Sequence, residues 1–317
     1  MKFIPLTALC LTLPLLAFGE PARPHITDLS HIALYVHDPD KSRAFYKDFL
    51  GFAEPYSLTN KDGTLHLTFI KINDRQTIEL FPETETNRNS DRLYHVAVET
   101  DDAAGMRDYL AANGVKVPDK VGKGKIGNLN YFIKDPDGHI VEIVQYTPTS
   151  WSTLNAGKFL PDTRISTNIP HMGILVGDLD ASKKFYEGIL GFHEIWRGTK
   201  NPKALSWVHE QIPDGNGFFE FMLYDQLPDP DKRGRQHHFC LEVADIEKAK
   251  AILAERAAGI GYTKSLDVQT GVNRKRQLNV YDPDGTRVEL MEPQTVDGIA
   301  APSSTAPPPQ HPVQAKS

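Results

Sequence analysis

Residues 31–38 read His-Ile-Ala-Leu-Tyr-Val-His-Asp, and residues 77–81 read Thr-Ile-Glu-Leu-Phe. The same order occurs four times: a histidine opens an apolar strand, an aspartate follows seven positions later, and a later apolar strand bears a glutamate. The histidines are His31, His95, His171 and His238, and the glutamates, which follow 48, 47, 49 and 51 positions later, are Glu79, Glu142, Glu220 and Glu289. Four pairs at nearly constant spacing predict an internal repeat whose unit carries two potential metal ligands.

Each unit also contains the signals of a helix between its strands. An aspartate stands where a short carboxylate can cap a helix N-terminus, and a glycine stands where the helix C-terminus needs a residue that tolerates positive φ. The aspartates are Asp38, Asp102, Asp178 and Asp245, and the glycines are Gly51, Gly114, Gly191 and Gly259. Each unit is therefore predicted to run strand, helix, then strands. In the first unit we expect strands at 32–36, 53–58, 65–72 and 77–81 and a helix near 41–50.

The alternation of side chains along these strands separates the histidine and the glutamate from the core. Ile78 and Leu80 face one side of their strand and Glu79 faces the other, and His31 likewise lies opposite Ile32 and Leu34. The residue two positions after each histidine is small, which leaves room on the open face: Ala33, Ala97, Gly173 and Cys240. Two units side by side would combine two imidazoles and two carboxylates, a set suited to Zn, Ni, Fe(II), Mn or Co with one or two positions open to substrate oxygens. In the fourth unit His237 and His238 are both candidates for the ligand. The alternation along the strand and the position of Asp245, seven residues after His238, favour His238.

The repeat with its His and Glu positions resembles the vicinal oxygen chelate superfamily, which includes glyoxalase I, extradiol dioxygenases, fosfomycin-resistance enzymes, methylmalonyl-CoA epimerase and bleomycin-binding proteins. The resemblance extends from Asp28 to Pro293 and implies an α+β fold of four βαβββ modules in two domains. It also implies that the first-strand His and last-strand Glu of each module are the metal ligands. These are His31, Glu79, His95 and Glu142 in the first domain, and His171, Glu220, His238 and Glu289 in the second.

The resemblance leaves three classes of function open. A glyoxalase-like lyase or isomerase stabilises an enediolate of a small vicinal-oxygen substrate on a metal with two His and two Glu, and a ligating Glu moves a proton. An extradiol dioxygenase uses Fe(II) with two His and one Glu, and usually has its metal in the second domain only. Because a glutamate is present in all four modules, we favour the first class, with Glu79, Glu142, Glu220 and Glu289 as candidate catalytic bases. A non-catalytic small-molecule binding protein is the third class, and the four complete pairs argue against it.

Two observations argue against glyoxalase I itself. The export signal predicted below for residues 1–19 would take the chain away from the main thiol pool, and no site for the glutathione carboxylates is recognisable among Arg43, Arg92, Arg197 and Lys203. Among the remaining histidines, His66 and His209 are further acid or base candidates. His139, which follows a turn directly, is expected to be exposed and structural.

The chain is expected to divide into five segments. Residues 1–19 have the lysine, apolar run and small-residue end of a secretory signal, with cleavage before Glu20, so we predict a periplasmic or secreted protein. The first domain is predicted at 27–147, an irregular but ordered connector at 148–167 and the second domain at 168–293. A Pro/Ala-rich tail at 294–317 has too little apolar content to pack and is predicted to be disordered.

Charge and composition limit the partners. The formal net charge is −6 and no long basic run is present, which disfavours nucleic acid and anionic membranes. After signal cleavage no stable membrane insertion is expected, and Cys240 is the single cysteine of the mature chain. A small-molecule substrate is the expected partner. No oligomeric state is predicted.

Overall fold

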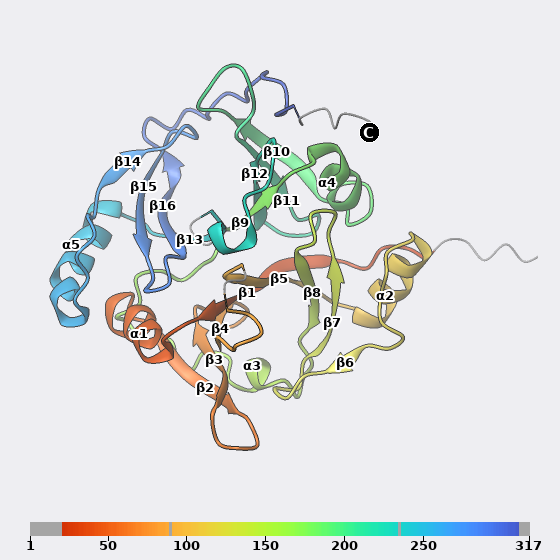
Figure 1. Ribbon diagram of the computed structural model, residues 1–317, viewed down its shortest axis with the longest axis horizontal. Helices are drawn as coiled ribbons and strands as arrows, with labels where there is room; N and C mark the ends of the chain where they lie inside the picture. The colour runs from red at the N-terminus through yellow and green to blue at the C-terminus, as the bar shows by residue number, and fades with distance from the viewer. Residues whose placement is uncertain (1–20, 89–90, 234–235, 311–317) are drawn as a thin grey trace, which may run out of the picture.

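The computed structural model describes residues 21–88, 91–233 and 236–310, and the predicted signal segment lies outside them. Its architecture is α+β, with two mixed sheets of eight strands each. Figure 1 shows the two sheets in two adjoining halves of the molecule, with the N-terminal half in red to yellow-green and the C-terminal half in green to blue. In the described part of the chain, no helix is long and apolar enough to span a bilayer.

The first sheet is formed entirely by the N-terminal half, and its order is β2-β3-β4-β1-β5-β8-β7-β6. In each module the first strand pairs in parallel with the last strand of the same module, and the two first strands pair antiparallel at the centre of the sheet. The strands are β1 (Ile26–Val36), β2 (Ala53–Thr59), β3 (Leu65–Lys71), β4 (Thr77–Pro82), β5 (Leu93–Thr100), β6 (Gly122–Lys123), β7 (Leu129–Lys134) and β8 (Ile140–Gln145).

The second sheet repeats this order in the C-terminal half as β10-β11-β12-β9-β13-β16-β15-β14. All eight predicted ligands thus come from central strands, four from each sheet. The strands are β9 (His171–Val176), β10 (His193–Gly198), β11 (Trp207–Gln211), β12 (Phe218–Leu223), β13 (His238–Glu242), β14 (Val268–Thr270), β15 (Lys275–Tyr281) and β16 (Arg287–Thr295).

The helices begin where the four aspartates predict. Each aspartate is an N-cap whose carboxylate accepts hydrogen bonds from backbone N–H groups of the first turn. The helices are α1 (Pro39–Arg43) followed by the π-helical turn η1 (Ala44–Phe49), α2 (Ala103–Ala112), α3 (Trp151–Leu154), α4 (Leu179–Tyr186), and α5 (Ile246–Ala257) followed by the 3₁₀ turn η3 (Ala258–Ile260). A further 3₁₀ turn, η2 (Pro230–Lys232), precedes β13.

The positive φ predicted for the glycine after each helix is found in three units and not in the fourth, although α4 itself ends at Tyr186, before Gly191. Gly51, Gly114 and Gly191 have φ values of 79°, 78° and 79°. In the fourth unit the 3₁₀ turn η3 extends the helix past Gly259, and Gly261 takes the left-handed position with φ 66°. The longer spacing of that unit is therefore accommodated by an additional turn.

The connector and the tail both lie against the body of the protein. Trp151 packs on Tyr56 of the first sheet with ring centroids 5.4 Å apart, in agreement with an ordered connector. Residues 296–310 differ from the predicted disorder. The N–H of Leu205 donates to the carbonyl of Pro307, and the N–H of Ser304 donates to the carbonyl of Arg197. A proline-rich segment is already extended and needs few hydrogen-bond partners, so it can lie along the surface of the protein at low entropic cost.

The two halves share one hydrophobic core. The stretch α1–η1 of the first half lies beside α5–η3 of the second, where Phe49 stacks on Tyr262 with centroids 4.6 Å apart (Figure 1). Two buried hydrogen bonds cross between the halves in reciprocal fashion. Tyr46 donates to Asp282 at 3.1 Å and Tyr186 donates to Asp135 at 3.0 Å. The two Asp-Pro-Asp-Gly turns are therefore part of the interface between the halves.

Asp282 should make the stability of the protein depend on pH. Burial, followed by the charge of Asp284, raises the pKa of Asp282 from 3.8 to about 6. The folded state then holds this proton more tightly than the unfolded state, so stability falls as pH rises from about 4 to about 6, by at most about 3 kcal/mol. We expect Asp282→Asn to stabilise the protein more at about pH 7 than at about pH 4.5, as measured by urea unfolding. The exposed carboxylate variant Asp119→Asn is the control, and an equal effect of Asp282→Asn at both pH values would contradict the prediction.

Two candidate metal centres

The register of the central strands brings each His and Glu to the same face. Ala33 of β1 pairs with Glu79 on one side and with His95 on the other. Ala97 of β5 likewise pairs with His31 and with Glu142. Each small side chain thus lies between an imidazole and a carboxylate, and the larger groups extend over it into a common space.

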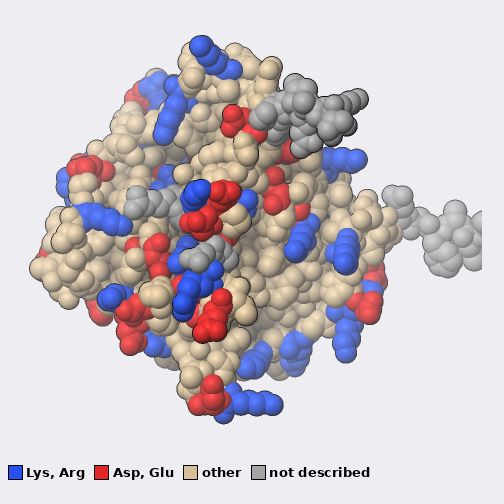
Figure 2. All heavy atoms as spheres, in the orientation of Figure 1, with Lys and Arg blue, Asp and Glu red and all other residues tan. Residues whose placement is uncertain are grey.

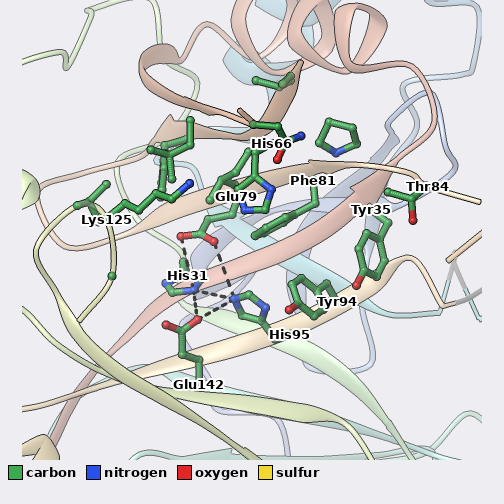
Figure 3. A pocket seen from close by; sticks show the side chains of 18 of the residues that line it. His31, Tyr35, His66, Glu79, Phe81, Thr84, Tyr94, His95, Lys125 and Glu142 are labelled. Atoms are coloured by element: carbon green, nitrogen blue, oxygen red, sulfur yellow. Dashed lines mark hydrogen bonds and ion pairs between the residues drawn. The ribbon is translucent and has the colours of Figure 1, made fainter. Parts of the chain in front are cut away.

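In the first centre the imidazole Nε2 atoms of His31 and His95 lie 2.9 Å apart. Figure 3 shows both rings pointing toward the two glutamates. Glu142 Oε2 lies 3.1 Å from His31 Nε2 and 2.9 Å from His95 Nε2. Glu79 is held less closely, with its oxygens 3.7 Å and 3.9 Å from the same two nitrogens. Donors bound to one ion at about 2.1 Å and at right angles lie about 3 Å apart, so this spacing fits a divalent metal. The four residues are at most 8% exposed.

The electrostatics of the first centre also favour a cation. Burial lowers the pKa of His31, but the charges of Glu79 and Glu142 outweigh it and raise the pKa to about 9. Burial raises the pKa of Glu79, whereas for Glu142 the two imidazoles overcome burial and lower the pKa. The two carboxylates therefore hold positive charge between them, as a proton on His31 or as a metal ion that displaces that proton.

A hydrogen-bonded chain behind His31 fixes which of its nitrogens faces the centre. The Tyr146 hydroxyl donates to the carbonyl of Arg75 at 2.8 Å, and a carbonyl can only accept. Ser30 Oγ, 2.9 Å from the Tyr146 hydroxyl, must then donate to it, so Ser30 accepts from His31 Nδ1 at 3.1 Å. With its proton on Nδ1, neutral His31 presents the lone pair of Nε2 to the centre. Such outer partners orient metal-binding histidines and raise their basicity.

Tyr146→Phe should weaken metal binding by about 10-fold, at the lower end of the effects of outer-shell partners, because Ser30 loses the acceptor that orients it. Zn²⁺ titration calorimetry on the metal-free protein measures this change. Tyr131→Phe is the matched control, because the buried Tyr131 hydroxyl has no hydrogen-bond partner among the described residues. Equal affinities in the two variants would show that the chain does not support the centre.

A cavity of about 660 Å³ opens onto the first centre. Its wall is largely aromatic: Tyr35 and Tyr94 stack with centroids 4.9 Å apart, and Phe81 meets Tyr94 edge-on at 5.0 Å. Phe132 packs against His95 at 5.3 Å and is 44% exposed. His66 and Lys125 also line the cavity. Figure 3 shows them together with Tyr35, Phe81 and Tyr94 around the centre.

The second centre has the same four donor types at similar spacing. The Nε2 atoms of His171 and His238 are 3.3 Å apart. Glu289 Oε2 lies 3.1 Å from His171, and Glu220 Oε2 lies 3.4 Å from His171 and 3.3 Å from His238. All four donors lie within 4.8 Å of one another, as do those of His31, Glu79 and His95 in the first centre.

The surroundings of the second centre differ from those of the first. Its cavity measures about 190 Å³, and Trp196, Trp207 and Arg287 line it. Arg287 Nη2 lies 2.6 Å from His238 Nδ1. Burial, followed by the charge of Arg287, lowers the pKa of His238 well below its usual value.

The structure places the other predicted residues as follows. His66 lines the first cavity and His209 the second, where burial lowers the pKa of His209 to about 3. The exposed position expected for His139 is wrong, because its ring is buried between the halves and bonds Asp135 at 2.8 Å. His237 bonds Asp91 at 2.9 Å, away from the centre that His238 faces.

The four cations considered for glutathione carboxylates do not line the first cavity. Arg43 bonds Glu54, Arg92 bonds Glu83 and Arg197 bonds Glu194, while Lys203 lies exposed. Lys125 is the one lysine or arginine among the described residues that line this cavity. Sequence reasoning did not find Lys125, Arg287, the aromatic wall or the Ser30–Tyr146 chain. Of these features, only the position of Phe81 could have been predicted from the sequence, because the alternation along the strand places Phe81 on the same face as Glu79.

Comparison with known proteins gives matches in both halves. The family model described as Glyoxalase/Bleomycin resistance protein/Dioxygenase superfamily matches residues 28–143 and 168–290. A probable lactoylglutathione lyase of Vibrio parahaemolyticus is 32% identical over 122 residues, which are 36% of this chain and 88% of the relative. A lactoylglutathione lyase of Pseudomonas putida is 28% identical over 167 residues, 43% of this chain and 95% of the relative.

Solved structures with a similar fold span most of the chain. The 2,3-dioxygenase LapB of Pseudomonas sp. KL28 has a TM-score of 0.64 at 15% identity and covers 86% of this chain and 93% of its own. An extradiol ring-cleaving dioxygenase of B. fuscum has a TM-score of 0.66 at 18% identity and covers 89% of this chain and 76% of its own. At such identities the likeness concerns the fold.

Proposed function

The chain belongs to the glyoxalase/bleomycin resistance protein/dioxygenase superfamily, and from this premise we propose that it is a metal-dependent enzyme of the lyase or isomerase type. The observation that carries the proposal is the first centre, where two imidazoles and two carboxylates converge at the base of a 660 Å³ cavity. His31, Glu79, His95 and Glu142 would hold a divalent ion such as Zn, Ni, Fe(II), Mn or Co. Such an ion would act as a Lewis acid on two adjacent substrate oxygens.

The two glutamates have different tasks in this proposal. Glu142 is fixed by both imidazoles and by Asn130 Nδ2, which donates to its Oε1 at 2.6 Å. Glu79 has no contact with an imidazole closer than 3.7 Å, so it is the carboxylate that can move toward the substrate. We assign Glu79 as the base that would remove a proton from the carbon bearing one of the two vicinal oxygens and return it to the neighbouring carbon, which bears the other.

The wall of the first cavity suggests the kind of substrate. Five phenylalanine or tyrosine side chains and one lysine favour a small molecule with a flat or apolar body and at most one anionic group. The relatives named lactoylglutathione lyase make a 2-oxoaldehyde–thiol adduct the first compound to test. Because the engaged arginines provide no obvious partner for glutathione carboxylates, we expect adducts of small thiols to be better substrates than the glutathione adduct.

The aromatic wall also supports a second candidate, an extradiol dioxygenase acting on a planar catechol. Four protein ligands argue against it, because they leave at most two positions on an octahedral ion, which a bidentate substrate would fill before dioxygen could bind. The proposal is tested by screening small-thiol and glutathione adducts and catechols with the metal-loaded protein and with the chelator-treated protein. Isomerised adduct that appears only with metal supports it. Activity that survives complete metal removal would refute it.

We further propose that the protein is exported, from the pattern of residues 1–19. No nucleic-acid partner is proposed, since Figure 2 shows basic and acidic side chains intermingled on the face in view. The mass of the protein recovered from the periplasm or the medium of an expressing culture would identify cleavage before Glu20.

A further inference from the structure

The two centres share their four donor types and differ at two positions next to the second histidine of each. His95 pairs with Ala33, whereas His238 pairs with Gly173. On the other side, Arg287 of β16 pairs with His238. The corresponding residue of β8, two positions before its glutamate, is Ile140. An arginine and a glycine thus replace an isoleucine and an alanine around one imidazole.

Arg287 determines which nitrogen of His238 carries a proton. Its Nη2 lies 2.6 Å from His238 Nδ1, and a guanidinium has donors but no acceptor. Nδ1 must therefore accept, which leaves the proton of the ring on Nε2. Nε2 is the atom that faces His171 and Glu220. A protonated Nε2 has no lone pair for a metal, in contrast to His31, whose proton is held on Nδ1.

Gly173 allows this position of the ring. A Cβ at Gly173 would lie 2.0 Å from His238 Cε1 and 2.1 Å from Nδ1, so the imidazole occupies the space that a methyl group would need. In the first centre that space belongs to the Cβ of Ala33. The ring of His238 therefore lies closer to the backbone of its neighbouring strand than an alanine would permit.

We propose that Arg287 holds the second centre free of metal, so that of the two centres only the first binds a metal ion. This rests on the proposed function for the first centre, and it assigns Arg287 as the residue that distinguishes the two. The guanidinium lines the same cavity as Glu220 and Glu289, so its positive charge also opposes a divalent cation there. The second domain then serves as a partner that supports the core of the first.

Removal of Arg287 should convert the second centre into a metal site. The carbonyl of Gln236 lies 3.3 Å from His238 Nδ1 and can accept its proton once the guanidinium is gone. His238 would then present a free Nε2, as metal-binding histidines do when a backbone carbonyl accepts from the other nitrogen. Arg287→Ile introduces the side chain of the corresponding position in the first half.

The test is Zn²⁺ binding to the metal-free full-length protein, measured by calorimetry and by elemental analysis after desalting. We expect about one tightly bound ion in the unmodified protein, and about two in Arg287→Ile, with second-site affinity at least about 100-fold above that of the unmodified protein. Adding Gly173→Ala should tighten the new site further, and adding Glu289→Gln should return the content to one. Arg276→Ile, which removes another arginine from the same sheet, should leave it at one.

The tautomer of His238 provides a readout that does not depend on metal. Long-range ¹H–¹⁵N spectra of histidine-labelled protein should show the proton on Nε2 in the unmodified protein and on Nδ1 in Arg287→Ile. Two tight ions in the unmodified protein, or one in a folded Arg287→Ile variant, would overturn the proposal. If the first centre binds no ion but Arg287→Ile gains one, the proposed function fails while the role of Arg287 stands.

Discussion

Glu142→Gln should abolish tight metal binding and lower kcat/KM by more than about 100-fold, beyond the cost of losing an outer-shell partner. The reason is geometric. Glu142 is the carboxylate closest to both imidazoles, at 3.1 Å and 2.9 Å, and the amide that replaces it carries no charge to balance a divalent ion. Elemental analysis of the purified variant and initial rates with an active adduct measure the two effects.

The control for Glu142→Gln is Glu54→Gln, which neutralises a half-buried strand glutamate that bonds Arg43 outside both centres. Its metal content should match that of the unmodified protein. A Glu142→Gln variant with full metal content and turnover would show that the first centre is wrongly assigned.

Phe49→Ala should destabilise the protein by about 3–5 kcal/mol, the cost of emptying a large buried site. Phe49 is fully buried. Its ring centroid lies 4.6 Å from that of Tyr262 in the other half and 5.4 Å from that of Phe45. Its carbonyl accepts a hydrogen bond from Arg256. The loss therefore affects the contact between the halves as well as the core of the first. Urea unfolding followed by circular dichroism measures it.

Leu154→Ala, at a residue 62% exposed, is the control for Phe49→Ala and should change stability by less than about 0.5 kcal/mol. A loss below about 1 kcal/mol for Phe49→Ala would mean that the two halves do not depend on this contact. We expect both halves to unfold together in each variant, because one core joins them.

The repeat predicts much of the fold because its signals are local. Asp38 and its three counterparts cap helices through bonds to residues two or three positions away, and the alternation around Glu79 sets the face of its strand. The superfamily and the two-sheet α+β architecture follow from these signals. The residues His31, Glu79, His95 and Glu142 converge because the same local pattern recurs on neighbouring strands.

Features that join distant segments could not be predicted in this way. Tyr146 supports His31 from 115 positions away in sequence, and the contact of Arg287 with His238 depends on the register of two strands and on a missing Cβ at Gly173. His139 follows an Asp-Pro-Asp-Gly turn, and such turns are usually exposed, but the other half of the molecule covers it. Composition alone also misplaced residues 296–310, because it does not reveal the backbone groups of Arg197 and Leu205 that bond this segment.

The central claim is that the first centre moves a proton without consuming dioxygen. The most direct measurement records oxygen uptake with an electrode during turnover of the metal-loaded protein in D₂O, and follows the product by NMR. We predict no oxygen uptake above the background. We also predict deuterium at the carbon that receives the proton, and no such deuterium with the Glu79→Gln variant. Oxygen uptake that matches product formed, with no deuterium at that carbon, would contradict the claim and identify the protein as a dioxygenase.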